Sequence, residues 1–213
     1  MSARFVIVGA GGFGRGVYRW ITTSPNFLLR NSVSEVVFLG DKANLELLPG
    51  RLLSNIEDYI PEQNDRVLCA VAAPAIRSHL VNQMVSRGVR FGTFVDDRVV
   101  VAGTSTIGEG SIICPGTVLG ADVILGKHVH VNFNCSVGHD SVVGDFSTLS
   151  PAVNIMGEVR VGEGVFIGGS AVILPRTSLG EHAVVGAGAV VLSGADPHVT
   201  MVGNPARPTR GTH

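Results

Sequence analysis

The chain has 213 residues and a mass of 22.2 kDa, which suits two domains of roughly 100 residues each. Its 16 Lys and Arg balance 17 Asp and Glu, so no basic surface is expected that would attract nucleic acid or an anionic membrane. The 28 glycines show no three-residue period, which excludes collagen, and aromatic residues are only 6% of the chain, which argues against large aromatic cores.

The cysteines and the N-terminus bear on the compartment. Cys69, Cys114 and Cys135 are odd in number and far apart, so neither a disulfide framework nor a paired-cysteine metal site is expected. The chain enters its first apolar run after four residues, without a signal-peptide core, and no apolar stretch is long enough for a transmembrane helix. We therefore expect a cytoplasmic protein that does not insert into a membrane.

The first half of the chain alternates short apolar runs with helical patterns. Residues 5–8, 36–39 and 67–71 are continuous apolar runs, as expected of strands that are buried on both faces. A helix is expected after the first run, and Ile76, Leu80, Met84 and Val85 recur at helical spacing after the third. This order predicts a small Rossmann-like parallel α/β domain over residues 1–94, with about four strands.

A glycine-rich turn follows the first expected strand. Gly9, Gly11 and Gly14 form the pattern GxGxxG between a strand and a helix, where backbone N–H groups can face a phosphate. Fewer than 100 residues leave no room for the second half of a dinucleotide fold, so a mononucleotide moiety is favoured over NAD. Asp41 follows the second strand, where it either accepts hydrogen bonds from a ribose or base or is simply solvated.

The second half is built on a period of six. From Val95 onward every sixth residue is aliphatic, and the fifth residue of each hexad is small or β-branched. A parallel β-helix needs this period, with the first residue of each hexad buried on the axis and the small fifth residue allowing the chain to turn. Three hexads per coil predict between five and six coils. The aliphatic positions are Val95, Val101, Ile107, Ile113, Leu119, Leu125, Val131, Val137, Val143, Leu149, Ile155, Val161, Ile167, Ile173, Leu179, Val185 and Val191.

His139 and Asp140 occupy the third and fourth positions of one hexad, where side chains are expected to be exposed at a corner. An exposed histidine is often only solvated. Here the adjacent carboxylate can fix one tautomer of the ring and stabilise its protonated form, the pairing that general-base catalysis uses.

The hexads, the closing segment 202–207 (VGNPAR) and the N-terminal turn 9–15 (GAGGFGR) together resemble the sugar O-acyltransferase, sialic acid O-acetyltransferase NeuD family and its PglD-like relatives, N-acetyltransferases of nucleotide-linked amino sugars. The resemblance covers nearly the whole chain. It implies a left-handed parallel β-helix of hexapeptide repeats over residues 95–213, a homotrimer, and the use of acetyl-CoA, without a metal, to acetylate a UDP- or dTDP-linked amino sugar.

The resemblance also assigns roles to residues. It makes His139 the general base with Asp140 beside it, and it makes the Gly157 N–H an oxyanion donor. The cofactor positions that it implies are Thr148, Gly169 and Ala187, and the substrate positions are Gly11, Gly12, Phe13 and Asp41. This chain departs from the family at Thr148, where some relatives carry His, at Phe13, where the family often carries His, and at Gly40-Asp41, where it often carries two Asp.

Three alternatives remain open from the sequence. A sugar hydroxyl or sialic acid can replace the amine as acceptor, because one histidine base serves either nucleophile. A trimeric scaffold that only binds a nucleotide has the same two parts. His128 and His130 form an HxH pair of the kind that γ-type carbonic anhydrases use for zinc, although no third ligand is evident.

Overall fold

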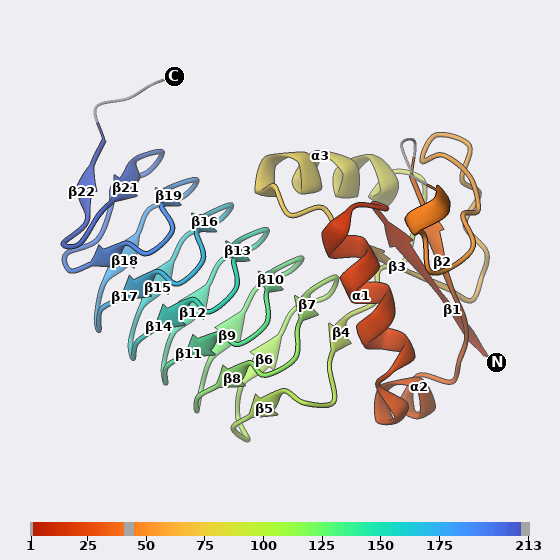
Figure 1. Cartoon of the computed structure of the whole chain (residues 1–213), viewed down its shortest axis with the longest axis horizontal. Coiled ribbons are helices and arrows are strands. Elements are labelled where there is room, and N and C mark those ends of the chain that lie inside the picture. The colour runs from red at the N-terminus through yellow and green to blue at the C-terminus, as the bar shows by residue number, and fades with distance from the viewer. Residues whose placement is uncertain (1, 41–44, 210–213) are drawn as a thin grey trace.

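The structure, a computed structural model, describes residues 2–40 and 45–209 of the chain. Within these residues an N-terminal α/β region is followed by a long coil of very short strands, which leads away from the α/β region to the C-terminus (Figure 1). None of the helices in the described ranges is both long enough and apolar enough to cross a membrane.

The N-terminal sheet is parallel, with the order β2-β1-β3. The sequence predicted about four strands, whereas the described residues form three. At each edge the neighbouring segment meets the sheet at a single bridge, Phe38 with Leu52 and Val67 with Phe91, and so does not extend into a further strand. The elements are β1 (Ala3–Val8), α1 (Gly12–Thr22), α2 (Pro25–Arg30), β2 (Val33–Leu39), a 3-10 turn at Leu45–Leu47, β3 (Asp65–Cys69) and α3 (Pro74–Val85).

Two glycines shape the turn from β1 to α1. Gly9 has a φ of +101°, a backbone conformation that favours glycine. Gly14 lies so close to the strand that an added Cβ would be 1.8 Å from the Gly9 carbonyl oxygen. The backbone conformation at Gly9 and the close packing at Gly14 therefore require glycine for the strand-to-helix turn itself.

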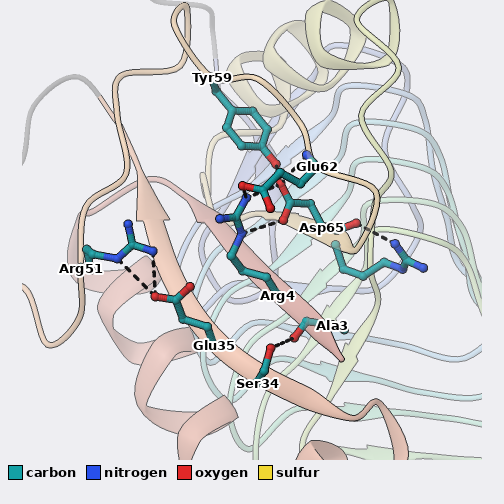
Figure 2. A network of polar contacts seen from close by, with 9 residues as sticks. Ala3, Arg4, Ser34, Glu35, Arg51, Tyr59, Glu62 and Asp65 are labelled. Atoms are coloured by element: carbon teal, nitrogen blue, oxygen red, sulfur yellow. Dashed lines mark hydrogen bonds and ion pairs between the residues drawn. The ribbon is translucent and has the colours of Figure 1, made fainter. Parts of the chain in front are cut away.

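A buried carboxylate ties the far end of this sheet together (Figure 2). Asp65 accepts two hydrogen bonds from the Arg4 guanidinium, at 2.7 and 2.9 Å, one from the Tyr59 hydroxyl, and one from the Glu62 amide at 2.9 Å. Burial alone would raise the pKa of Asp65, but these hydrogen bonds outweigh it and hold that pKa below its ordinary value. The network fixes the loop before β3 to the start of β1.

The coil is a parallel β-helix, as the hexads predicted, with three faces. Face 1 runs through β4 (Phe94–Val95), β7 (Ile112–Ile113), β10 (His130–Val131), β13 (Thr148–Leu149), β16 (Phe166–Ile167), β19 (Val184–Val185) and β21 (Thr200–Val202), with β22 (Arg207–Pro208) antiparallel at its end. Face 2 comprises β5 (Val100–Val101), β8 (Val118–Leu119), β11 (Ser136–Val137), β14 (Asn154–Ile155), β17 (Val172–Ile173) and β20 (Val190–Val191). Face 3 comprises β6 (Thr106–Ile107), β9 (Ile124–Leu125), β12 (Val142–Val143), β15 (Arg160–Val161) and β18 (Ser178–Leu179). The six strands of face 2 agree with the expected number of coils.

The corners of the coil are made by the fourth residue of the hexad and not by the fifth. Asp122, His128, Asn134 and Asp140 have φ values between 54° and 58°, and glycine takes this position at Gly110 and Gly116. The fifth residue instead points to the axis, and its size is limited by the space there. The expectation that the small fifth residue makes the turn is therefore corrected.

Face 1 carries the N-terminal domain. Phe94 and Ile112 on this face are fully buried and belong to one apolar cluster with Phe5, Val17 and other residues of the α/β region. The Phe27 ring of α2 packs edge-on against Phe94, with 4.9 Å between ring centroids. A shared apolar core of this kind fixes the domain against the coil.

Candidate active site

The edge between faces 2 and 3 presents a histidine and a carboxylate to solvent. The His139 Nδ1 atom lies 2.7 Å from Asp140 Oδ2, and the two side chains are 62% and 55% exposed. A carboxylate only accepts hydrogen bonds, so Nδ1 donates to it and Nε2 keeps its lone pair. This tautomer is the one that a general base needs.

Gly157 lies one coil further along, next to the same imidazole. A Cβ added at Gly157 would be 2.5 Å from the His139 Nε2 atom, so only glycine fits beside the ring. Among the described residues the Gly157 amide has no hydrogen-bond acceptor. His139, Asp140 and Gly157 are therefore brought together, and a free N–H lies close to the basic nitrogen.

The implied cofactor positions lie elsewhere on the coil. Gly169 and Ala187 follow β16 and β19, so they share the edge between faces 1 and 2 and not the edge of His139. A Cβ added at Gly169 would meet only the Pro151 carbonyl oxygen, at 3.2 Å, which leaves its outer side open. The structure thus places the expected catalytic residues on one edge of the chain and the expected cofactor residues Gly169 and Ala187 on another.

Thr148 is not available at a cofactor site. It is 3% exposed on face 1, beneath the N-terminal domain. Its hydroxyl donates to the Ala72 carbonyl at 2.8 Å and accepts from Arg77 at 3.0 Å. The expected contact between Thr148 and the cofactor is corrected, because both functions of the hydroxyl are used between the two domains.

The glycine-rich turn offers an open helix N-terminus. Gly11 is the N-cap of α1 and makes no side-chain cap, and a Cβ added at Gly11 or Gly12 would meet nothing within 4 Å. The Phe13 ring instead packs on His130 of face 1, with 5.0 Å between centroids. The Phe13 ring is therefore used in the contact between the domains. Asp41 lies outside the described residues.

The HxH pair is buried and does not form a metal site. His130 Nε2 donates to the Cys69 carbonyl at 3.0 Å, and its Nδ1 atom accepts from Arg77 at 3.1 Å. His128 is 5% exposed, although a fourth-position residue was expected to be exposed, because the N-terminal domain covers this corner. No group of three His, Cys, Asp or Glu in the described part of the chain can hold a metal ion.

Sequence reasoning missed Arg77. The inward face of α3 carries Arg77, Val81 and Met84, whereas Ile76 and Val85 are 56% exposed. The apolar spacing identified the helix but misjudged its buried face. An arginine within that pattern was the only signal, and it does not reveal where the side chain points.

A β-helix of hexapeptide repeats with an exposed histidine–carboxylate pair on one edge is typical of acyltransferases. The model of the bacterial transferase hexapeptide family (six repeats) matches residues 158–193. WeeI from Acinetobacter baumannii AYE is 30% identical, covers 98% of this chain and 100% of its own, and superposes with a TM-score of 0.88. The chain belongs to the hexapeptide-repeat acyltransferase family.

Two further relatives are informative about ligands. The acetyltransferase domain of PglB from Neisseria gonorrhoeae, solved in complex with acetyl coenzyme A, is 27% identical, covers 98% of this chain and 100% of that chain, and has a TM-score of 0.88. GDP-perosamine N-acetyltransferase from Escherichia coli O157:H7 is 33% identical over 147 residues, which are 65% of each chain. The match thus spans less than two thirds of that curated relative.

Proposed function

We propose that the chain is an acetyl-CoA-dependent N-acetyltransferase that acts on the amino group of a nucleotide-linked amino sugar in bacterial-type surface glycan synthesis. The observation that carries this proposal is the His139–Asp140 pair, at 2.7 Å, beside the free amide of Gly157. The PglB domain solved with acetyl coenzyme A and the relative named for GDP-perosamine support the two substrate classes.

The geometry supplies the proton transfers of the reaction. His139 Nε2 accepts a proton as the sugar amine attacks the thioester carbonyl, while Asp140 stabilises the charge on the ring. The Gly157 N–H faces the oxygen that becomes negative. When the C–S bond breaks, the proton on His139 passes to the departing thiolate, which leaves an amide on the sugar and free CoA.

The division of the site between two edges supports a homotrimer. His139 lies on the edge opposite face 1, whereas the glycine-rich turn contacts face 1 through Phe13 and His130. A single chain therefore keeps the nucleotide half-site away from its own base. A neighbouring β-helix that brings its His139 edge to the Gly169 and Ala187 edge of this chain would complete the site.

The nucleotide half-site is assigned to residues 1–94 and the transfer half-site to residues 95–213. Gly11, Gly12 and Phe13 supply backbone N–H groups to the diphosphate at the N-terminus of α1. UDP and dTDP remain the expected nucleotides, and the name of the perosamine enzyme adds GDP. The three free cysteines fit the expected cytoplasmic location.

A sugar hydroxyl is the alternative acceptor. An acyl-carrier-protein-dependent UDP-N-acetylglucosamine O-acyltransferase from Pseudomonas putida is 32% identical over 51% of this chain. Because His139 serves either nucleophile, only the acceptor decides between the two reactions.

The test is thiol release from acetyl-CoA across a panel of UDP-, dTDP- and GDP-linked amino sugars, free amino sugars and sialic acid. We expect turnover on a nucleotide amino sugar and a loss of at least about 1000-fold in kcat for His139→Asn. His182→Asn, at an exposed fourth-position corner on another edge, serves as the control and should retain full activity. Turnover on hydroxyl acceptors alone would move the protein to the O-acetyl branch, and full activity of His139→Asn would refute the assigned base.

A further inference from the structure

One arginine is buried between the two domains without a carboxylate partner. Arg77, on the inward face of α3, is 0% exposed. Burial lowers the pKa of its guanidinium to about 10, which leaves the group charged at neutral pH. No acidic side chain among the described residues forms an ion pair with Arg77. Burying a charge costs free energy unless the group is fully hydrogen-bonded, so the hydrogen-bond partners of Arg77 must compensate for its burial.

The partners come from both domains. On the N-terminal side Arg77 Nη1 donates to the carbonyl oxygens of Val71 and Ala72, at 2.7 and 3.1 Å. On the coil side Arg77 Nε donates to the His128 carbonyl at 3.0 Å, and Nη2 donates to the carbonyls of Phe146 and Ser147. One planar group therefore holds the loop between β3 and α3 against two successive coils.

The side chains of His130 and Thr148 complete the network. Each accepts a hydrogen bond from Arg77 and donates one to a backbone carbonyl of the N-terminal domain. His130 donates to the Cys69 carbonyl through Nε2 and accepts from Arg77 through Nδ1, so its ring is neutral in this arrangement. Thr148 likewise accepts from Arg77 and donates to the Ala72 carbonyl. Every contact on the N-terminal side ends at residues 69–72, which shows which segment the network holds.

That segment borders the glycine-rich turn. Residues 69–72 are the end of β3 and the start of its loop, at the same edge of the sheet where β1 leads into α1. A Cβ added at Gly9 would be 3.2 Å from the Ala70 carbonyl oxygen, so the two turns are in contact. The position of this edge on face 1 thus determines where a phosphate at the N-terminus of α1 would lie relative to the coil.

We infer that Arg77 is a positioning residue, which holds the nucleotide-binding edge of the N-terminal sheet in one orientation on the β-helix so that the acceptor amine reaches the transfer site. The inference rests on the proposed function. Arg77 does not contact the reacting atoms. A cation with carbonyl acceptors suits this role, because backbone oxygens fix the main chain itself and not mobile side chains.

The test compares Arg77→Lys with the wild-type protein as the full chain. Lysine keeps the charge but offers one ammonium in place of a planar fork, so it cannot reach both domains at once. We expect kcat/KM for the nucleotide amino sugar to fall about 100-fold, the size of effect that a displacement of about 1 Å produces, while KM for acetyl-CoA stays within about twofold. Thr148→Val, a milder change in the same network, should lower kcat/KM for the sugar in the same direction by less.

Arg4→Met provides the matched control. It removes the half-buried arginine that pairs with the buried carboxylate of Asp65 at the opposite end of the same sheet, so it should lower the Tm without a selective loss for the nucleotide sugar. Equal losses for both substrates in Arg77→Lys, or a sugar-selective loss in Arg4→Met, would reduce Arg77 to a merely structural residue and overturn the inference.

Hydrogen exchange separates this inference from the proposed function. In Arg77→Lys we expect faster exchange of the amides of residues 69–73, with the coil strands β10 and β13 unchanged. Unchanged exchange at residues 69–73 would refute the inference even if the wild-type enzyme is active. Absence of thiol release by the wild type would refute the proposed function, and with it the catalytic purpose given to Arg77.

Discussion

His139 and His128 stand on neighbouring corners of the same coil and have opposite environments. The side chain of His139 is 62% exposed, on the edge between faces 2 and 3, with Asp140 at hydrogen-bond distance. His128 is 5% exposed under the N-terminal domain, between the rings of Phe91 and Phe146. The hexad gives both residues an outward direction, and the neighbouring domain decides which of them meets solvent.

This difference has chemical consequences. Burial, reinforced by the Arg77 charge, lowers the pKa of His128 to about 4, so the ring is neutral and inert at neutral pH. His139 has a carboxylate that fixes its tautomer, and the rest of its ring is open to solvent. A corner histidine of this coil is therefore accessible to a substrate only where the N-terminal domain leaves the edge uncovered.

Among substitutions that keep both histidines, Gly157→Ala should have the largest effect on this contrast. The added Cβ would be 2.5 Å from His139 Nε2, so the ring has to turn away from Asp140 or from the substrate. We expect kcat to fall about 100-fold or more with little change in Tm, measured by thiol release and thermal unfolding.

Gly103→Ala is the matched control, because Gly103 takes the same hexad position on the same edge. A Cβ there would meet nothing within 4 Å. If the two alanine variants have the same kcat, the position of the His139 ring beside Gly157 does not matter for activity.

Asp140→Asn should have a smaller effect on the same site. The amide can still accept from His139 Nδ1, but it no longer stabilises the protonated ring, so the base is weakened and not displaced. Because the pair is more than half exposed and screened by solvent, we expect a loss in kcat of about tenfold. A loss as large as that of His139→Asn would contradict a role limited to charge stabilisation and would mean that the carboxylate is essential to hold the reactive tautomer of the ring.

The sequence contains the repeat in full but only part of the site. The six-residue period predicted the β-helix and its number of coils because each hexad repeats the same local geometry. It also placed His139 and Asp140 at an exposed corner, whereas Gly157 entered only through the family resemblance; the structure shows that it lies 18 residues on, at the same edge. Whether a corner is covered depends on the other domain, and a local pattern does not contain that information.

The misjudged residues lie at the contact between domains. Thr148 was expected at the cofactor and Arg77 was not singled out, yet the two share a hydrogen bond beneath α3. The backbone of Phe13 stays a predicted substrate contact, but the sequence did not show that its ring packs on His130. In each case the side chain is used by a partner more than 50 residues away in the sequence, which no motif specifies.

The smallest expected effect concerns His128 and the stability of the fold. In the folded state the pKa of His128 is about 4, below the ordinary value of 6.5 that applies in the unfolded chain. The unfolded chain therefore binds more protons between these values. Stability is complete above about pH 6.5 and falls as the pH drops towards 4.

His128→Phe should remove this loss, because a phenyl ring keeps the contacts with Phe91 and Phe146 and cannot be protonated. Phenylalanine tolerates the required backbone, since Phe146 has a φ of 58° at the same corner one coil later. The Nδ1 atom of His128, which has no hydrogen-bond partner among the described residues, would also be eliminated. Urea unfolding at pH 7.5 and pH 5 should show a loss for the wild type that exceeds that of the variant by on the order of 1 to 2 kcal/mol.

His128→Phe should still lose some stability at pH 5, because burial also holds the pKa of His130 well below its ordinary value. His182→Phe is the control. It changes a histidine at the same hexad position on the same edge, but an exposed one, and should leave the difference between the two pH values unchanged. If the loss of stability between pH 7.5 and pH 5 is the same in both variants as in the wild type, burial does not keep His128 neutral in the folded protein. The proposed contrast between His128 and His139 is then wrong for His128.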